Sequence, residues 1–548
     1  MVEVDLFQGK VKLSDESNNV NKEIFNQRIE TKLSLRKKTV NNILYNKRIL
    51  GNNSFGFNTK KIKWKLLYDI TNIDFLSDKS KSKYQLIFNE NDEKILLEAS
   101  KYLKSKTLDD IKFGIILTQA FIKRNMNDDL TNSINLLFIY ELFHIIDKIN
   151  NDEEIIFNIL YIIISYSSIN KDKNLATILL SPDSYKIWEK CFNLQNFDIF
   201  YEIICVLNNI IQENQIGGCN LIRSNFFKNN IYNFYSSEYM IFKKYDQNKF
   251  DINYYITKDG INLFCSLIII PTADLDNVTK NEVISSKQKL VNLVILYFDT
   301  NIFEDYFKCI YSINFAVEQD FMLFKELEKN NFFENVLNNK KFFEEKQILF
   351  YLNKIFGNYI AYANNIPNKL LEDMINFEAD YLKKCKDFSH RKNIFFTLSN
   401  ILLSKDEIYV KIFEIENLLS NIFNCLKYSY SFIEVREILY FFTVLFSFIN
   451  NKYFIELEKN HLMELVFFHA KNSFENKVDG LNICFTIFEF YLAFGKELSK
   501  YFGGKNLIKE KFYKLGGKEL LEKYINFPDE NLTHNIINTV NSYILSKI

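Results

Sequence analysis

The sequence predicts an all-α protein built as a solenoid of helical repeats. Its 548 residues include only 14 Gly and 4 Pro, far fewer than tight turns between many strands would need. Hydrophobic residues make up 47% of the chain, which is ample for a large buried core. From about residue 90 to the C-terminus, apolar helical segments follow one another, and no boundary between globular domains is evident among them.

One helical segment recurs along the chain, with asparagine four residues after its first position. Copies occupy residues 354–358, 396–400 and 205–209. The first positions of successive copies, Lys354 and Phe396, are 42 residues apart. The equivalent position of the next unit, Phe441, follows 45 residues after Phe396. Repeats of this length with two or three helices indicate a HEAT or armadillo array. Residues from about 90 onward then accommodate about ten repeats.

The recurring asparagines predict a chemical role for one surface of the array. Asparagine is a poor residue for a helix interior, because its amide competes with the backbone for hydrogen bonds. A buried amide also costs stability unless it is paired. Asparagines at one register of successive helices would form a row of amides that can hold the backbone of an extended peptide. The alternative is a purely structural array, in which the amides bond the turns between repeats.

The chain divides into four predicted regions. Residues 1–24 are polar and predicted to be disordered, 25–50 form a basic helical segment, 51–85 form a linker, and 86–548 form the repeat array. The basic residues of the second region are Arg28, Arg36, Lys37, Lys38, Lys47 and Arg48. Such a run is usually a solvated tail or an arm that binds nucleic acid, although a protein partner is an open alternative.

Composition and motifs exclude several classes of function. The 68 basic and 68 acidic residues cancel, so overall charge favours neither direct nucleic-acid binding nor a membrane surface. Eight cysteines without a C-x-x-C pair predict reduced thiols in an intracellular protein. No signal peptide is evident, and the longest apolar stretches, 155–164 and 263–270, are too short to span a bilayer.

Catalytic and metal-binding motifs are also missing from the sequence. It contains no P-loop, no H-E-x-x-H and no paired metal-ligand spacing, and its five histidines are scattered. We therefore expect a protein that is not an enzyme and that needs no cofactor or metal. A solenoid subunit or regulator of an enzyme is the rival of a different class.

Several segments resemble the importin-α family. Residues 28–38 (RIETKLSLRKK) resemble its importin-β-binding segment, whose pattern is R-I-E-x-x-x-x-L-R-K. The segment at 396–400 is similar to the family's W-x-x-S-N-I helix, and 352–358 resembles its sixth repeat, where a cation such as Lys354 replaces tryptophan. Residues 515–518 and 528–531 resemble the last repeat. The resemblance covers nearly the full length in order.

This resemblance implies a right-handed armadillo superhelix that acts as a nuclear import adaptor. Cargo proteins with Lys/Arg-rich signals would bind in its concave groove, importin-β would bind the N-terminal segment, and an export receptor would recycle a protein that shuttles between nucleus and cytoplasm. The minor-groove residues would be Lys354, Asn358, Phe396, Asn400 and Phe441. The major-groove residues would be Cys205, Asn209 and Glu213. Importin-β would contact the six basic residues of region 25–50, and no cofactor is implied.

The chain departs from the family at most positions of the groove. Its only tryptophans, Trp64 and Trp188, lie outside the recurring segments, whereas the family carries tryptophan in most of them. An aromatic ring stacks on a lysine stem better than the thiol of Cys205 does, so we expect a weak major groove. The alternative function is an armadillo or HEAT scaffold that has lost signal recognition and binds other protein partners.

Overall fold

The structure is a computed structural model, and its described residues form helices and connecting turns with no β-strand among them. It describes residues 78–124, 136–149, 152–169, 173–211, 214–237, 252–296, 303–363, 365–405, 407–475, 477–500, 504–525 and 529–539. The expectation of an all-helical repeat fold is confirmed for these residues, whereas the armadillo subclass and the number of repeats stay predictions. The predicted disordered N-terminus, the basic segment at 25–50 and Glu213 lie outside the described residues.

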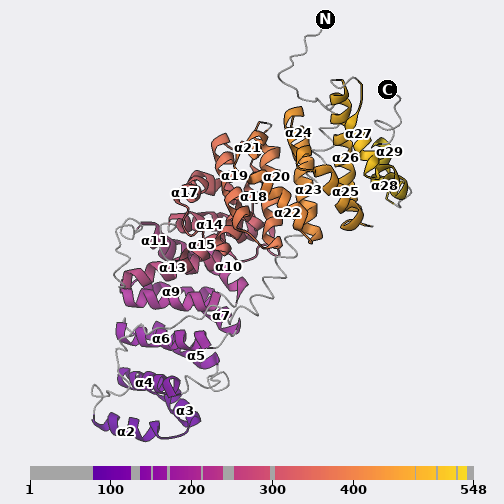
Figure 1. The fold of residues 1–548 in the computed structure, drawn as a ribbon. Coiled ribbons are helices and arrows are strands. Elements are labelled where there is room, and N and C mark those ends of the chain that lie inside the picture. The colour runs from indigo at the N-terminus through magenta and orange to yellow at the C-terminus, as the bar shows by residue number, and fades with distance from the viewer. Residues whose placement is uncertain are drawn as a thin grey trace. The chain divides into compact units, whose positions relative to one another are not determined.

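The chain separates into two compact units, which meet in sequence between Asn330 and Asn331. The helices of the first unit, coloured indigo to magenta in Figure 1, follow in order. They are α2 (Asp78–Phe88), α3 (Asp92–Leu103), α4 (Leu108–Arg124), α5 (Leu136–Lys148), α6 (Glu153–Ile169), α7 (Lys173–Leu179), α8 (Pro182–Phe192), α9 (Phe197–Ile211), α10 (Gln215–Arg223), the π-helical η3 (Phe227–Tyr232), α11 (Asn233–Ser237), α13 (Ile252–Ile268), α14 (Asn277–Leu296), α15 (Phe303–Gln319) and α16 (Leu323–Lys329).

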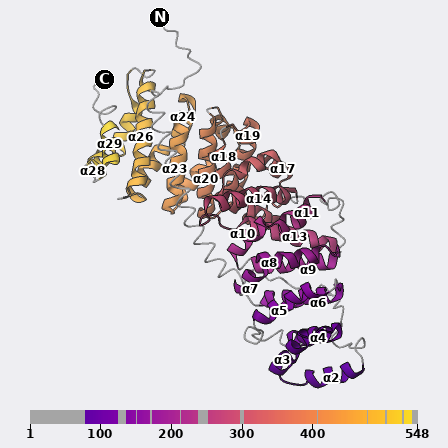
Figure 2. The same ribbon diagram turned by 180° about the vertical axis from the view of Figure 1, so that it is seen from behind.

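A stack of longer helices forms the inner layer of the first unit. Helix α4 packs on α6, α6 on α9, α9 on α13, and α13 on α15, with the remaining helices placed alongside them. Figure 2 shows these layers from behind. One contact between outer helices shows how neighbours are joined. The ammonium group of Lys190 on α8 donates hydrogen bonds to the carbonyls of Ile146, Asp147 and Ile149, at the C-terminal end of α5. A cation is favourable there because the last carbonyls of a helix lack intrahelical partners.

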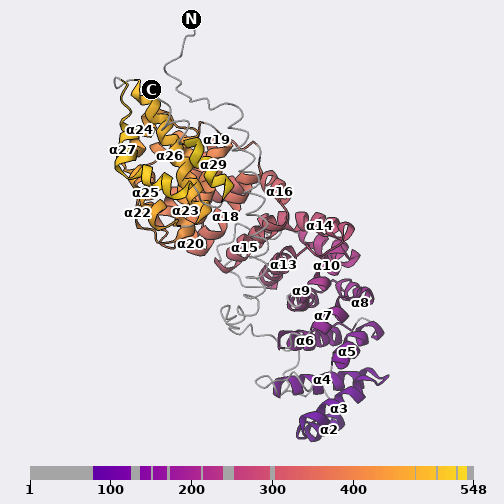
Figure 3. The same ribbon diagram turned by 90° about the vertical axis from the view of Figure 1, so that its right-hand side faces the viewer.

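The second unit repeats the same plan. Its helices are α17 (Phe332–Asn339), α18 (Lys346–Tyr362), α19 (Asn368–Lys384), α20 (Phe388–Ser404), α21 (Tyr409–Glu414), α22 (Leu418–Tyr428), α23 (Phe432–Phe446), α24 (Asn451–Lys459), α25 (Leu462–Asn472), α26 (Val478–Ser499), α27 (Leu507–Lys514), α28 (Gly517–Tyr524) and α29 (Glu530–Thr539). Its inner stack runs α18, α20, α23, α26 and α29, each packed on the next, and Figure 3 shows this stack from the side.

In several repeats of the second unit, two short helices precede the inner helix, and the chain turns sharply between them at a residue with left-handed backbone geometry. Asn417, His461 and Gly516 stand at the corners before α22, α25 and α28, with φ of 62°, 59° and 87°. This left-handed backbone suits glycine and, among other residues, is tolerated best by asparagine. No such corner interrupts α19, which runs as one helix through the equivalent place. The second unit therefore combines three-helix and two-helix repeats.

Aromatic side chains fill the core between inner and outer helices of the second unit. Phe454 of α24 stacks on Phe494 of α26 with ring centroids 4.6 Å apart, and Phe467 of α25 lies 4.5 Å from Phe488 of the same inner helix. Aromatic pairs add a geometric preference to the burial of apolar area. These contacts fix α26 against the two helices that precede it.

One described helix, α26, has the length and hydropathy to cross a bilayer. Of its most apolar window, 61% is buried inside the fold. A core helix that packs against neighbours on several sides has the same composition, since it is apolar around most of its circumference.

Candidate protein-binding surface

Side-chain amides join neighbouring inner helices of the second unit. The Nδ2 of Asn400 on α20 donates to the backbone oxygen of Gly357 on α18 at 3.0 Å. The two helices approach closely here, because a Cβ on Gly357 would lie 2.6 Å from the hydroxyl of Thr397. The amide nitrogen thus bonds the backbone of the preceding repeat, whereas the Oδ1 of Asn400 is buried without a hydrogen-bond partner among the described residues.

A buried carboxyl group belongs to the same interface. The Nδ2 of Asn353 lies 2.7 Å from both carboxyl oxygens of Glu378 on α19 and 3.1 Å from the hydroxyl of Thr397 on α20. Glu378 is completely buried, and burial raises the pKa of its carboxyl group well above the ordinary value. A neutral carboxyl with amide and hydroxyl neighbours is tolerated in a core where an unpaired carboxylate is not.

The predicted minor-groove residues divide into one half-buried side chain and four buried ones. Lys354 is half-buried, and its ammonium group lies 5.1 Å from the centroid of the Phe350 ring. Asn358 and Asn400 are 3% and 2% exposed, Phe396 is 7% exposed, and Phe441 is fully buried. In this structure, these four side chains pack between helices. A role for them in binding a peptide stays a prediction.

Two of the three predicted major-groove residues lie on α9 in the first unit. Cys205 and Asn209 are half-buried, whereas Glu213 lies outside the described residues. The Nδ2 of Asn209 donates to the hydroxyl of Ser167 on α6 at 3.1 Å, which repeats the pattern of an amide bonded to the preceding inner helix. The neighbouring amide of Asn208 donates in the other direction, to the backbone oxygen of Asp259 on α13.

A second buried carboxyl group stands beside these residues. Glu202 on α9 is fully buried, and neither of its carboxyl oxygens has a hydrogen-bond partner among the described residues. Burial, with a smaller contribution from the nearby Asp198, raises the pKa of Glu202 to about 8. The side chain is therefore mostly protonated at physiological pH and offers little negative charge to a ligand.

Half-buried side chains recur at one register on two successive inner helices. On α23 they are Arg436, Tyr440 and Thr443, and on α26 they are Asn482, Thr486 and Glu489. Spacings of four and three residues place each set on one face of its helix. We call these six residues the inner-helix stripe. Arg436 reaches across the interface, with a guanidinium nitrogen 3.9 Å from a carboxylate oxygen of Asp479 near the start of α26.

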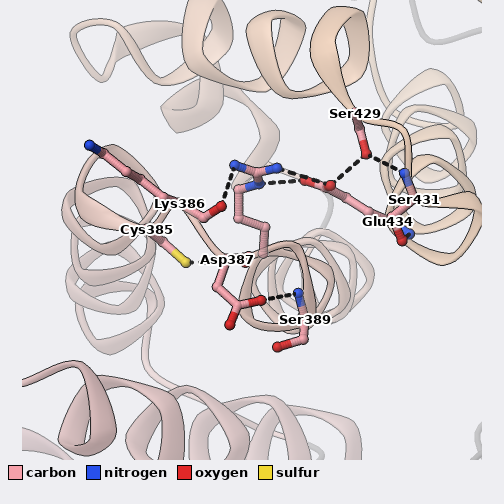
Figure 4. Close-up of polar contacts among 8 residues, drawn as sticks. Cys385, Lys386, Asp387, Ser389, Ser429, Ser431 and Glu434 are labelled. Atoms are coloured by element: carbon pink, nitrogen blue, oxygen red, sulfur yellow. Dashed lines mark hydrogen bonds and ion pairs between the residues drawn. The ribbon is translucent and has the colours of Figure 1, made fainter.

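A buried ion pair joins two repeats where α20 and α23 begin (Figure 4). The guanidinium of Arg391 on α20 donates two hydrogen bonds to the carboxylate of Glu434 on α23, and a third to the backbone oxygen of Lys386. The hydroxyl of Ser429 also donates to Glu434. Glu434 is fully buried, and its bonds to the guanidinium raise the pKa of Arg391. One side chain thereby joins two loops from adjacent repeats.

Contacts of the same kind extend to the neighbouring loops of the second unit. The ammonium group of Lys384 lies 2.7 Å from a carboxylate oxygen of Glu344, in the loop before α18. On the other side, the ammonium group of Lys477 lies 4.1 Å from the ring centroid of Phe432. The loops before α18, α20, α23 and α26 are therefore joined in series along one edge of the unit.

Sequence reasoning missed the residues that make these joints. Arg391 and Glu434 belong to no recurring segment, yet they are 43 residues apart, which is within the repeat length read from the sequence. Pairs of opposite charge at that separation are the signal that would have found them. Among the described residues, no group of three or more His, Cys, Asp or Glu side chains has the arrangement of a metal site.

Comparisons with known proteins support the fold and give no family. No protein-family model matches the chain, and no curated protein matches it. An engineered protein solved by the Northeast Structural Genomics Consortium is similar in fold, with a TM-score of 0.56, 11% sequence identity, and coverage of 82% of this chain and 98% of that one.

Two structures of Kap proteins also match, with lower scores. Kap95p, in a complex with RanGDP described for nuclear import, has a TM-score of 0.44 and 9% identity, covering 91% of this chain and 65% of its own. Kap121p bound to Ste12p has a TM-score of 0.36 and 13% identity, covering 81% of this chain and 44% of its own. At such identities the likeness concerns the fold alone.

The expected membership of the importin-α family is wrong. No comparison of sequences finds that family, and the two natural proteins named among the structural matches are Kap95p and Kap121p. The segments that carried the resemblance are short, and the basic one lies outside the described residues. A short helix with asparagine and serine at fixed spacing is also what any stack of helices needs for hydrogen bonds between repeats.

Proposed function

We propose that this chain is a helical-repeat scaffold that binds a segment of a partner protein along its inner helices. The observation that carries the proposal is the inner-helix stripe, where equivalent half-buried positions recur on α23 and α26. Repetition of one binding position at each repeat is how a solenoid holds an extended chain. The stripe contains Arg436 and Tyr440, whose residue types dominate the binding energy of many interfaces.

The surroundings of the stripe favour binding over catalysis. Amide and ion-pair contacts between repeats fix the inner helices before any partner arrives, so little conformational freedom is lost on binding. The buried carboxyl groups Glu202 and Glu378 have raised pKa values, but they lie inside the helix packing, where a substrate has no access. They therefore support packing, and we infer that the chain is not an enzyme.

The proposal leaves the partner's cellular role open. Binding of importin-β, of cargo with Lys/Arg-rich signals or of an export receptor, and shuttling between nucleus and cytoplasm, were implied by a resemblance that no comparison supports. These partners and this shuttling therefore need direct experimental tests. We adopt the alternative hypothesis, a scaffold that binds other protein partners.

Selection from a displayed library of short random peptides, with the full chain as bait, tests the proposal. Enriched peptides should lose about tenfold in affinity when Tyr440→Ala or Arg436→Ala is introduced, as expected for truncated anchor residues. Tyr513→Ala and Lys518→Ala, which also change exposed side chains of the second unit, serve as matched controls and should leave affinity unchanged. A library that enriches no peptide, or peptides indifferent to both stripe variants, would refute the proposal.

A further inference from the structure

Exposed apolar side chains gather in the two loops that Arg391 joins. Phe388 is 54% exposed, Tyr428 is 63% exposed, Tyr430 is fully exposed, and Ile433 is 44% exposed. Exposed apolar residues are ordinary when they are scattered singly, but a group of them rimmed by charge marks an interaction site. We call residues 383–388 and 427–433 the loop edge.

The loop edge is held in place by buried contacts rather than by its own exposed side chains. Arg391 bonds the carboxylate of Glu434 and the backbone of Lys386, and the hydroxyl of Ser429 completes the cluster (Figure 4). Each loop also begins an inner helix with a side-chain cap, because Asp387 accepts from the backbone N–H of Ser389, and Ser431 accepts from that of Glu434. The exposed rings are therefore presented on a fixed frame.

The charge of the loop edge selects among partners. Residues 383–388 and 427–433 contain four exposed lysines and one acidic residue, Asp387. Lys384 is paired with Glu344, and the other three lysines are Lys383, Lys386 and Lys427. In Figure 4 the side chain of Lys386 extends away from the ion-pair cluster, and the ammonium group of Lys427 lies 5.3 Å from the ring centroid of Tyr428. The surplus is positive, whereas the whole chain carries none.

We propose that the loop edge docks an acidic protein segment that carries apolar anchor residues. The three lysines would meet its carboxylates, and Phe388, Tyr428, Tyr430 and Ile433 would contact its anchors. The inference rests on the proposed function, since it names the chemistry of one partner of the same scaffold. A single-stranded nucleic acid also combines negative charge with stacking, but it needs a row of cations along its backbone. The loop edge offers only a few lysines and includes the aliphatic side chain of Ile433, which favours a mixed acidic and apolar segment over a nucleic acid.

Direct titration of the full chain with defined probes tests the inference. The first probe is a labelled short peptide in which Phe and Leu alternate with Asp and Glu. The second replaces Phe and Leu by Ser, and the third replaces Asp and Glu by Lys. The fourth probe is a short oligouridylate. We expect the first probe to bind in a saturable and salt-sensitive manner, and the second and third to bind at least about tenfold more weakly.

Two pairs of substitutions locate the binding. Phe388→Ala with Tyr430→Ala removes apolar anchors, and Lys386→Glu with Lys427→Glu reverses charge. Each pair should weaken the first probe by at least about tenfold, and the charge reversal should also reduce its salt dependence. Tyr513→Ala with Lys518→Glu is the matched control and should change neither. The altered side chains are exposed, and unchanged thermal unfolding would show that each variant folds.

Other outcomes overturn the inference in distinguishable ways. Tighter binding of oligouridylate than of the acidic peptide, lost on charge reversal, would assign the loop edge to nucleic acid. A dimer of the chain that dissociates when Tyr430 is changed would assign it to a second copy. Failure of the acidic peptide while library peptides still bind the inner-helix stripe would remove this inference and leave the proposed function standing. Failure of both would remove both.

Discussion

Arg391 should contribute more to stability than any exposed ion pair of the second unit, and Arg391→Met tests this directly. The substitution removes the guanidinium but keeps most of the aliphatic stem. It leaves the carboxylate of Glu434, which is 0% exposed, with the hydroxyl of Ser429 as its remaining side-chain donor. Breaking a buried pair by removing one partner destabilises by about 3–5 kcal/mol. Because the side chain of Arg391 is 20% exposed and Ser429 remains, we expect about 3 kcal/mol.

Two further variants separate the ion pair from nonspecific damage. Lys384→Met breaks the contact with Glu344, whose two side chains are 45% and 84% exposed, and should cost less than about 1 kcal/mol. Combining Arg391→Met with Glu434→Leu removes both charges, so the double variant should be more stable than Arg391→Met alone. That order holds only if the cost arises from an uncompensated buried charge.

Urea unfolding followed by circular dichroism measures the global effect, and hydrogen exchange measures the local one. Arrays of repeats can unfold in stages, so the exchange of amides in α20 and α23 is the sharper measurement. A local loss of about 3 kcal/mol corresponds to exchange about a hundredfold faster in these helices. The reasoning would be refuted if Arg391→Met and Lys384→Met lowered the free energy of unfolding equally. It would also be refuted if the double variant Arg391→Met with Glu434→Leu were less stable than Arg391→Met alone.

Two other predictions concern buried polar groups. The pKa of Glu202 is about 8 in the folded chain and near the ordinary 4.5 in the unfolded chain. The free energy of unfolding therefore has its full contribution from this group below pH 4.5 and loses it as the pH rises to about 8. Glu202→Gln should make unfolding in urea less dependent on pH across that window, and an unchanged dependence would contradict the assignment. Asn400→Ala should cost about 1 kcal/mol, because its hydrogen bond to Gly357 is lost. If it instead weakened binding of a basic peptide without lowering the unfolding midpoint, the amide would have the peptide-binding role predicted from the sequence.

The repeat length was the most reliable information in the sequence. Steps of 42 to 45 residues were read from the recurring segments, and contacts between inner helices have the same separations. Asn209 bonds Ser167 across 42 residues, Asn400 bonds Gly357 across 43, and Thr397 contacts Asn353 across 44. The separations agree because each repeat stacks on the next in register, so equivalent positions on neighbouring helices become contact partners.

The direction in which an asparagine points could not be read in the same way. Residues 354–358 and 396–400 give the same helical period whether the amide faces a peptide or the preceding helix, since these directions differ by a rotation about the helix axis. The structure buries Asn358 and Asn400.

The loop-edge residues were missed for another reason. Phe388 and Tyr430 lie outside the apolar period of the helices, and their exposure follows from the loop frame that Arg391 and Glu434 build.

The distribution of polar contacts indicates where recognition takes place. In the second unit, the amide nitrogens of Asn353 and Asn400 and the Arg391–Glu434 pair form hydrogen bonds within the array, so a partner that used these groups would have to break existing bonds. Such an exchange returns little net free energy, because one hydrogen bond replaces another. The amide oxygens of Asn353 and Asn400 have no hydrogen-bond partner among the described residues, but they are buried between helices. Side chains of the inner-helix stripe and the loop edge retain some exposed surface that a partner can bury. Affinity should therefore depend on Tyr440 and Tyr430 far more than on Asn358 and Asn400, because the two asparagines are almost completely buried.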